Sequence, residues 1–340
     1  MDSNIPFRER PQCAVAANSS GGVALKFPYL PEDIERLIVE MTAELHLQTG
    51  RQLVLACHLY REWISPIIYR RATLKSTARA EKFAATLSLT SGAPTLPPLG
   101  LAHRVRVLNF ANDVDTQVVG QVISLCENVV SIAYWKSRSK AIPTPFIDLS
   151  GCVSLRRLSM DLKHIIPQAA LDQQLPPAHP LLQVTHLDIC SPDITELYSI
   201  LSQLTNLTHL FFCEDHYLSI PTRAHDIPAY LPTNLRACVI HDASSPNQGR
   251  NLPLIPSLSS NQEIDPRVVI GAESYKEELL DSVPYLLVRS FSKLLLDWSG
   301  ASPAGTDVWA EAENIITARR LQRAGSLEVH SASASTTLHT

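Results

Sequence analysis

The chain has 340 residues, of which 45% are hydrophobic and 18% are charged. This length and composition allow one large or two modest folded domains with a substantial core. The net charge is −4, from 29 basic and 33 acidic residues, and no long run of either sign occurs. The charge pattern therefore argues against nucleic-acid binding.

No segment predicts export or membrane insertion, because residues 1–24 lack the apolar core of a signal peptide and no later run reaches the length of a membrane span. The seven cysteines are spread singly, without a C-x-x-C pair. This spacing disfavours a disulfide framework or a zinc ribbon and suits a reducing compartment. We expect the protein in the cytoplasm or the nucleus.

A compact helical module is predicted over residues 25–75, after a disordered leader at 1–24. Pro31 suits the first position of a helix, and acidic residues follow it in the first turn. An apolar stripe then recurs at helical spacing, formed by Ile34, Leu37, Ile38 and Met41.

A second helical pattern begins near Gln52 and is expected to break at Ser65, because Pro66 disfavours the α conformation in the residue before it. Two or three short helices cannot bury all their apolar faces against one another. Some of this surface should therefore meet a partner.

The module resembles an F-box, most closely the F-box-like variant of large fungal families. The resemblance is carried by Leu30-Pro31-x-x-Ile34, by Leu53-Val54, and by Trp63 ahead of Pro66-Ile67-Ile68-Tyr69-Arg70. It implies binding to a Skp-type adaptor, and through it to a cullin, with adaptor contacts from Leu30, Pro31, Ile34 and Trp63. The chain departs from the commonest pattern at Ile64-Ser65-Pro66, directly after the tryptophan. The alternative is a plain helical cap on the downstream domain.

Residues 76–104 are expected to connect two parts of the chain, as a helix over 76–89 and a Pro-rich linker. Beyond them, short strand-like segments recur at intervals of 23–32 residues. They cover 105–110, 129–134, 155–160, 184–189, 207–212, 235–240 and 267–270. Helical spacing at 114–125 and 193–204 falls between strands.

This alternation predicts an α/β fold with a parallel sheet and helices on its outer face. Residues 105–324 resemble an irregular leucine-rich-repeat solenoid, an architecture that often follows an F-box. A doubly wound α/β domain is the competing architecture. It would normally carry a Gly-rich turn after the first strand, whereas Ala111-Asn112-Asp113 stands there.

The C-terminal part is expected to close the repeat array. Residues 285–298 form an apolar stretch, 299–306 a turn-rich break, and a helix capped by Thr306 or Asp307 runs to Arg320. Its inward residues are predicted to be Val308, Trp309, Ala312, Ile315 and Ile316. Residues 325–340 are predicted to form a disordered tail.

No catalytic motif is present: the chain lacks a phosphate-binding loop, G-x-S-x-G and H-E-x-x-H. We expect neither an enzyme nor a bound cofactor. His186 and His209 are the third residues of successive repeats, with Asp188, Cys190 and Cys213 nearby, which is a ligand set that zinc can use. Without close ligand spacing, we interpret the histidines as a shared polar repeat position and predict no metal.

A target-binding surface is predicted on the concave face of the sheet, where alternate strand residues point away from the outer helices. The candidates for contact are Trp135, Arg157, His186, Asp188, His209 and Phe211, with Asn109, Asp161 and His241 on the same face. The alternative is that the C-terminal segment folds over this face. In that case the loop at 244–260 becomes the better candidate.

Together these features predict an interaction protein that recruits a target for ubiquitylation as the substrate receptor of a cullin–RING ligase. Two alternatives remain open. One is a leucine-rich-repeat-like binding protein that acts without a ligase, and the other is a diverged α/β enzyme.

Overall fold

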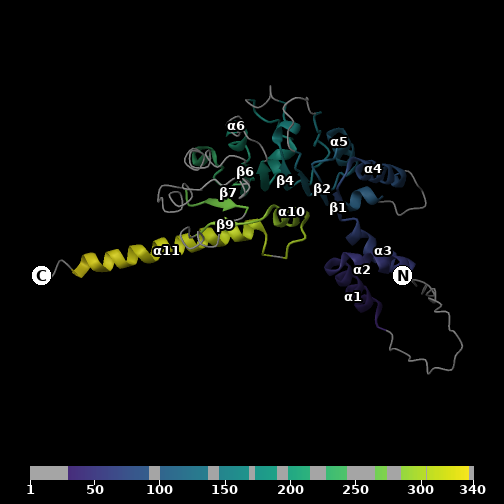
Figure 1. The fold of residues 1–340 in the computed structure, drawn as a ribbon, viewed down its shortest axis with the longest axis horizontal. Helices are drawn as coiled ribbons and strands as arrows, with labels where there is room; N and C mark the ends of the chain where they lie inside the picture. Colours follow the sequence, from purple (N-terminus) through teal and green to yellow (C-terminus); the bar gives the residue numbers. More distant parts are fainter. Residues whose placement is uncertain are drawn as a thin grey trace, which may run out of the picture. The chain divides into compact units, whose positions relative to one another are not determined.

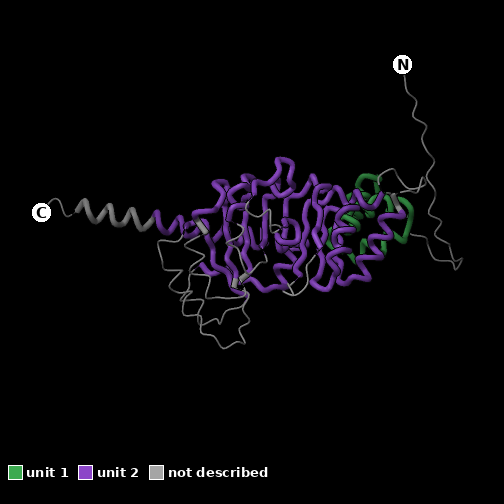
Figure 2. The backbone as a smooth tube through the Cα atoms, turned by 90° about the horizontal axis from the view of Figure 1, so that it is seen from above, with its two compact units in different colours: residues 1–70 green, residues 71–340 purple. Residues whose placement is uncertain are grey.

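A computed structural model of the protein describes residues 30–91, 100–136, 145–167, 173–189, 198–214, 227–242, 265–273, 285–303 and 305–336. The chain forms two compact units, residues 1–70 and residues 71–340, which are coloured separately in Figure 2. We call them the helical unit and the sheet unit.

Within residues 30–70, the helical unit contains three helices, α1 (Glu32–Leu45), α2 (Leu47–Ala56) and α3 (His58–Ile68). Its core is small and consists of Val39, Ala43, Trp63 and Ile64. The predicted break at Ser65 is wrong, because α3 continues through Pro66 to Ile68. Pro66 stands in the last turn, where it removes a single helical hydrogen bond. The break lies at Cys57, whose backbone is extended and whose thiol accepts a hydrogen bond from the Tyr60 amide.

Helices α1 and α2 touch at Gly50. A Cβ atom added there would lie 2.9 Å from the Cβ of Ala43. We expect Gly50→Ala to destabilise the helical unit by about 1–3 kcal/mol, because this overlap outweighs the gain in helix propensity. Gly120 in α5 (Thr116–Leu125) is the control, since no atom of the described residues outside its own helix backbone lies within 4 Å of the added methyl group. Gly120→Ala should raise stability by up to about 1 kcal/mol, and thermal unfolding of the two variants measures both effects. Equal melting of the helical unit in Gly50→Ala and the unmutated chain would contradict the close packing.

The sheet unit is an α/β fold, and its described residues contain nine parallel strands whose order in the sheet follows their order in the chain. The strands are β1 (Arg71–Leu74), β2 (Val107–Phe110), β3 (Ser131–Tyr134), β4 (Arg157–Met160), β5 (His186–Ile189), β6 (His209–Glu214), β7 (Ala237–Asp242), β8 (Val268–Ala272) and β9 (Leu287–Val288). The seven predicted strands are confirmed. The sequence did not predict β1 and β9, which are four and two residues long.

The outer face of the sheet carries α4 (Thr77–Ser91), α5 (Thr116–Leu125) and α6 (Tyr198–Leu201). One row of paired, fully buried side chains crosses seven strands beneath these helices: Leu108, Ile132, Leu158, Leu187, Leu210, Cys238 and Val268. Helix α4 belongs to this core through Ala80, Ala84 and Leu87. The segment that the sequence assigned to a connection is therefore part of the sheet unit, and the boundary lies at residues 70 and 71 rather than at 75.

The opposite face, called here the inner face, is covered by α10 (Phe291–Ser299) and α11 (Val308–Thr336) (Figure 1). These helices and β9 form the C-terminal segment, residues 285–336. A second hydrophobic cluster lies between this segment and the sheet. Val308, Trp309, Ala312 and Ile316 point inward as predicted. However, α11 lies across the inner face and contacts β7, β8 and β9, and it continues beyond Arg320 into the stretch predicted as a disordered tail.

Candidate docking surface

Helix α1 turns its largest apolar side chains to solvent. Val39 and Ala43 are buried in the core of the helical unit. The wider stripe at helical spacing lies on the surface, with exposed fractions of 40–72% for Ile34, Leu37, Ile38, Met41 and Leu45. We call this stripe the docking surface. A helix normally packs such a stripe against its own domain, so its exposure marks a surface suited to a partner.

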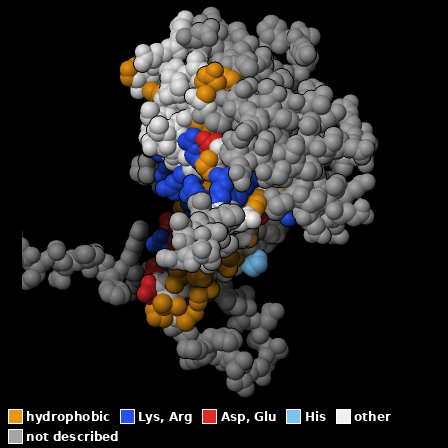
Figure 3. Space-filling model, turned by 90° about the vertical axis from the view of Figure 1, so that its left-hand side faces the viewer, with side chains coloured by type: hydrophobic (Ala, Val, Ile, Leu, Met, Phe, Trp, Pro, Cys, Tyr) orange, Lys and Arg blue, Asp and Glu red, His pale blue; other side chains and the backbone are white. Residues whose placement is uncertain are grey.

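Further apolar side chains are exposed on the same unit. Across the described residues, eighteen large hydrophobic side chains are exposed, and ten of them belong to the helical unit. Besides the docking surface, these are Leu30, Leu47, Leu55, Leu59 and Tyr69. Figure 3 shows hydrophobic side chains gathered in the lower part of the view. Scattered apolar residues are normal on protein surfaces, but this concentration in so small a unit is not.

A hydrogen bond to α3 and an ion pair within α1 flank the exposed stripe. The Tyr60 hydroxyl of α3 donates a hydrogen bond of 2.6 Å to the Glu35 carboxylate of α1. On another side of α1, Arg36 forms an ion pair with Glu40 at 2.7 Å. The apolar stripe thus lies between fixed polar groups, as in an interface with an apolar centre and a polar rim.

The structure divides the four predicted adaptor contacts. Leu30, Pro31 and Ile34 are exposed at the start of the docking surface. Trp63 is only 9% exposed and packs against Tyr60, with ring centroids 5.9 Å apart. The expectation that Trp63 offers its ring to a partner is therefore wrong, because this residue fills the core of the helical unit. Sequence periodicity identified Leu37, Ile38 and Met41 as one stripe but did not indicate which way the stripe faces.

The inner face of the sheet is not the open surface that the sequence predicted. Asp188, His209 and Phe211 are at most 7% exposed. The remaining candidates, Trp135, Arg157 and His186, are partly buried. The other residues predicted on this face, Asn109, Asp161 and His241, are buried as well. The predicted recognition surface is thus closed by the C-terminal segment, and the alternative loop at 244–260 lies outside the described residues.

Aromatic contacts fasten the C-terminal segment to the inner face. The Trp309 ring meets the rings of His186, His209 and Phe211 at centroid distances of 5.3–6.1 Å. Trp135 lies 6.2 Å from the Phe291 ring. The Arg157 guanidinium lies 5.2 Å from the centre of the Trp298 ring and donates a hydrogen bond to the Asp297 carbonyl. Burial lowers the pKa of Arg157, although Asp307 and Asp297 oppose this shift.

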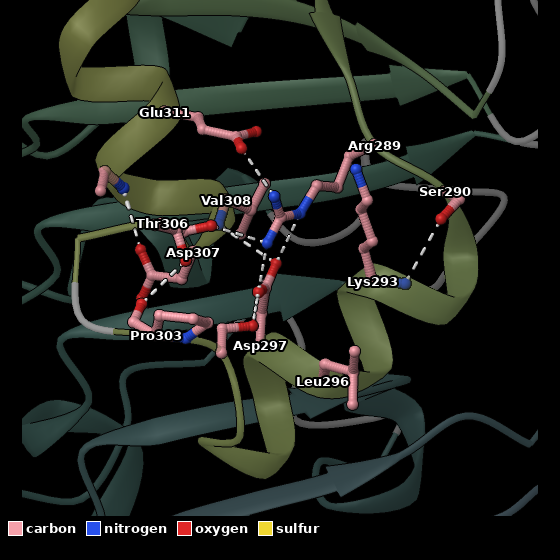
Figure 4. Close-up of polar contacts among 12 residues, drawn as sticks. Arg289, Ser290, Lys293, Leu296, Asp297, Pro303, Thr306, Asp307, Val308 and Glu311 are labelled. Atoms are coloured by element: carbon pink, nitrogen blue, oxygen red, sulfur yellow. Dashed lines mark hydrogen bonds and ion pairs between the residues drawn. The ribbon is translucent and has the colours of Figure 1, made fainter.

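A buried ion pair holds the C-terminal segment together internally (Figure 4). Both oxygens of Asp297 accept hydrogen bonds from Arg289, at 2.9 Å from Nε and 2.5 Å from Nη2. Asp297 also accepts from Ser302 and from the Val308 amide at the start of α11. Glu311 reaches the other side of the guanidinium at 2.6 Å. The two side chains of the central pair are 7% and 0% exposed, so this carboxylate joins α10 to α11 deep inside the protein.

The sequence predicted no metal at the histidine pair, and the structure describes only some of the residues that this prediction concerns. His186 and His209 are neighbours on β5 and β6, as expected, but Cys190 lies outside the described residues. In the described parts of the chain, no three His, Cys, Asp or Glu side chains are grouped so that they could hold a metal ion. Within the same residues, no helix is long and apolar enough to cross a membrane.

No family model matches the chain, and no curated protein matches it.

Proposed function

We propose that the chain is a protein-interaction adaptor: the helical unit is an F-box-like module that binds a Skp-type adaptor, and the sheet unit recruits a target. The protein then acts as a substrate receptor of a cullin–RING ubiquitin ligase in the cytoplasm or nucleus. It performs no bond chemistry. It places the target beside the ligase's conjugating enzyme and raises the effective concentration of the two.

The exposed stripe of α1 is the observation that carries the proposal. Exposed apolar side chains at helical spacing fit recognition in which a helix face docks against the groove of a partner. Leu30, Pro31 and Ile34 contribute the matching positions of the F-box-like pattern, and they are exposed beside the rest of the stripe. Trp63 takes a structural role in this proposal.

The sheet unit is, in this proposal, an irregular leucine-rich-repeat solenoid. Nine parallel strands in chain order, with a row of paired apolar residues under the outer helices, agree with stacked repeats. Because the C-terminal segment covers the inner face, we place target recognition outside that face. The segment at 244–260 is the candidate retained from the sequence.

Co-purification of the full chain with a purified Skp-type adaptor tests the docking surface. Leu37→Asp combined with Met41→Asp should abolish binding, because a central apolar anchor contributes about 2 kcal/mol or more, roughly 30-fold in Kd for each residue. Neither side chain belongs to the core of the helical unit, so circular dichroism should show the same helix content as in the unmutated chain.

Leu296→Asp on α10 is the matched control. Leu296 is 51% exposed and Leu37 is 53% exposed, so the two substitutions remove comparable surface from different units. The control should bind the adaptor normally. Absence of binding by the unmutated chain would refute the ligase assignment. Equal binding by the double variant and the unmutated chain would show that the adaptor contacts another surface.

A further inference from the structure

Two consecutive strands of the sheet present the same tripeptide beneath α11. These are Thr185-His186-Leu187 and Thr208-His209-Leu210, whose histidines and leucines pair in register across β5 and β6. In each, the threonine hydroxyl lies 2.9 Å from Nδ1 of the following histidine. This shared contact orients both rings in the same way.

The two imidazole rings stack on each other under a tryptophan. Their centroids are 4.4 Å apart and their planes differ by 9°. The Trp309 ring closes the stack edge-on, at 5.5 Å from His186 and 5.3 Å from His209. The pair therefore forms part of the surface that α11 contacts. Two positive charges at this separation would repel each other and would be poorly hydrated.

The charged groups around the pair have both signs. Arg157 on β4 and Arg236 ahead of β7 oppose protonation, whereas Asp307 and Glu313 from the α11 side favour it. Of these, Glu313 is the direct contact, with Oε1 3.2 Å from His209 Nε2.

Burial decides the balance between these opposing charges. It lowers the pKa of His186 to about 3, with smaller contributions from His209 and Arg157 in the same direction. Burial also lowers the pKa of His209, although Glu313 pulls the other way.

The layout of the core allows α11 to leave the inner face without unfolding strands β1 to β8. The hydrophobic cluster between the sheet and the outer helices is separate from the cluster around Trp309 on the inner face. Local opening of one layer is a common form of motion in proteins whose layers pack independently.

We propose that the stacked pair His186–His209 makes docking of α11 on the inner face pH-dependent, so that mild acid releases the helix and uncovers the sheet. In the open state the rings regain water, and the pKa of each rises towards the ordinary value near 6.5. A group whose pKa is lower in the closed state than in the open state stabilises the closed state at pH values above its open-state pKa. The stability is lost progressively as the pH falls from about 6.5 towards the closed-state value.

The size of the effect follows from the His186 value. At pH 5.0 an open-state imidazole is almost fully protonated, whereas closed-state His186 stays neutral. The open state therefore gains about 30-fold relative to its population at neutral pH, and His209 adds to this in the same direction. The inference is independent of adaptor binding.

Hydrogen exchange on the full chain at pH 7.5 and 5.0 tests the proposal. After correction for the intrinsic pH dependence, residues 308–320 should lose protection by about 30-fold or more at pH 5.0. Residues 116–125 in α5, on the other face of the sheet, should change little. Unchanged protection of residues 308–320 would overturn the proposal.

Substitution tests whether the histidines cause the effect. His186→Gln with His209→Gln should abolish the pH dependence, while His58→Gln, at an exposed position of the helical unit, should retain it. The same pH dependence in the double variant would overturn the proposal.

A titration of the unmutated chain gives an answer even if the double variant does not fold. NMR should show His186 neutral at pH 5.0 in the closed state. Protonation of His186 with a pKa near 6.5 in the closed state would overturn the proposal.

Discussion

Replacing Asp297 by alanine is expected to lower the free energy of unfolding of the sheet unit by about 3–5 kcal/mol. The side chain is completely buried and accepts hydrogen bonds from Arg289, Ser302 and the Val308 amide. Its loss leaves the Arg289 guanidinium in the interior with Glu311 as its one charged partner among the described residues, on the more exposed side. Most of the destabilisation comes from this incompletely paired charge rather than from the loss of a favourable attraction.

A double variant separates these two contributions. Arg289→Met with Asp297→Leu removes both charges and keeps apolar volume, so it should be less destabilising than Asp297→Ala alone. Urea unfolding, with separate probes for the helical and sheet units, measures the free energies. If the double variant loses as much stability as Arg289→Met and Asp297→Leu lose together when each is made alone, the pair is not coupled as the geometry indicates. If Asp297→Ala is neutral, the network in Figure 4 does not hold α10 to α11.

The strands could be predicted because their signal is local and repeated. Each contributes an apolar residue at the same position of the repeat, such as Leu108, Ile132 and Leu158, and these positions pair in register in the sheet. Spacing alone therefore predicted the order and the parallel direction. β1 was not predicted because Arg71–Leu74 directly follows α3, although it is as long as the predicted strands β2 and β3. A strand that adjoins a helix is hard to separate from the helix end by alternation alone.

The direction in which amphipathic elements face could not be predicted, because periodicity reports a stripe and not its partner. In α1 the small residues Val39 and Ala43 face the core, whereas Leu37 and Met41 face solvent. The prediction of an open inner face was wrong for a related reason. Phe211 and Trp309 are each apolar residues that need cover, and they bury one another although they lie far apart in the chain. The sequence predicted that Trp309 lies on the inward side of its helix and that Phe211 points away from the outer helices. Nothing local in the sequence indicated that these two faces meet.

The Arg289–Asp297 pair shows the same limit for polar residues. The two positions are eight residues apart, and an arginine and an aspartate at such spacing usually lie on a solvated surface. Only the fold reveals that the turn at Gly300, which has a left-handed backbone conformation, brings the start of α11 back over α10. The carboxylate then meets the first amide of α11, where the positive end of the helix dipole favours it.

Trp309→Ala is expected to destabilise the sheet unit by about 3–5 kcal/mol, because it removes one of the two buried tryptophans, Trp298 and Trp309, of the inner-face cluster. The ring is 3% exposed and touches the rings of Trp298, Phe211 and the histidine pair. Without it, α11 loses its main contact with β5 and β6. The helix should then exchange amide hydrogens faster than the rest of the unit.

Trp309→Phe should cost much less than Trp309→Ala. The buried Trp309 Nε1 group has no hydrogen-bond partner among the described residues, so its removal relieves a desolvation penalty that partly offsets the lost ring area. Phenylalanine also keeps an aromatic edge against the stacked histidines. Thermal and urea unfolding of the two variants, with α11 exchange as a second readout, gives the comparison. Equal stability of the alanine and phenylalanine variants would mean that Trp309 does not fasten α11 to the sheet. In that case other contacts between the segment and the sheet, such as those of Arg157 with Trp298 and the Asp297 carbonyl, would hold the C-terminal segment in place.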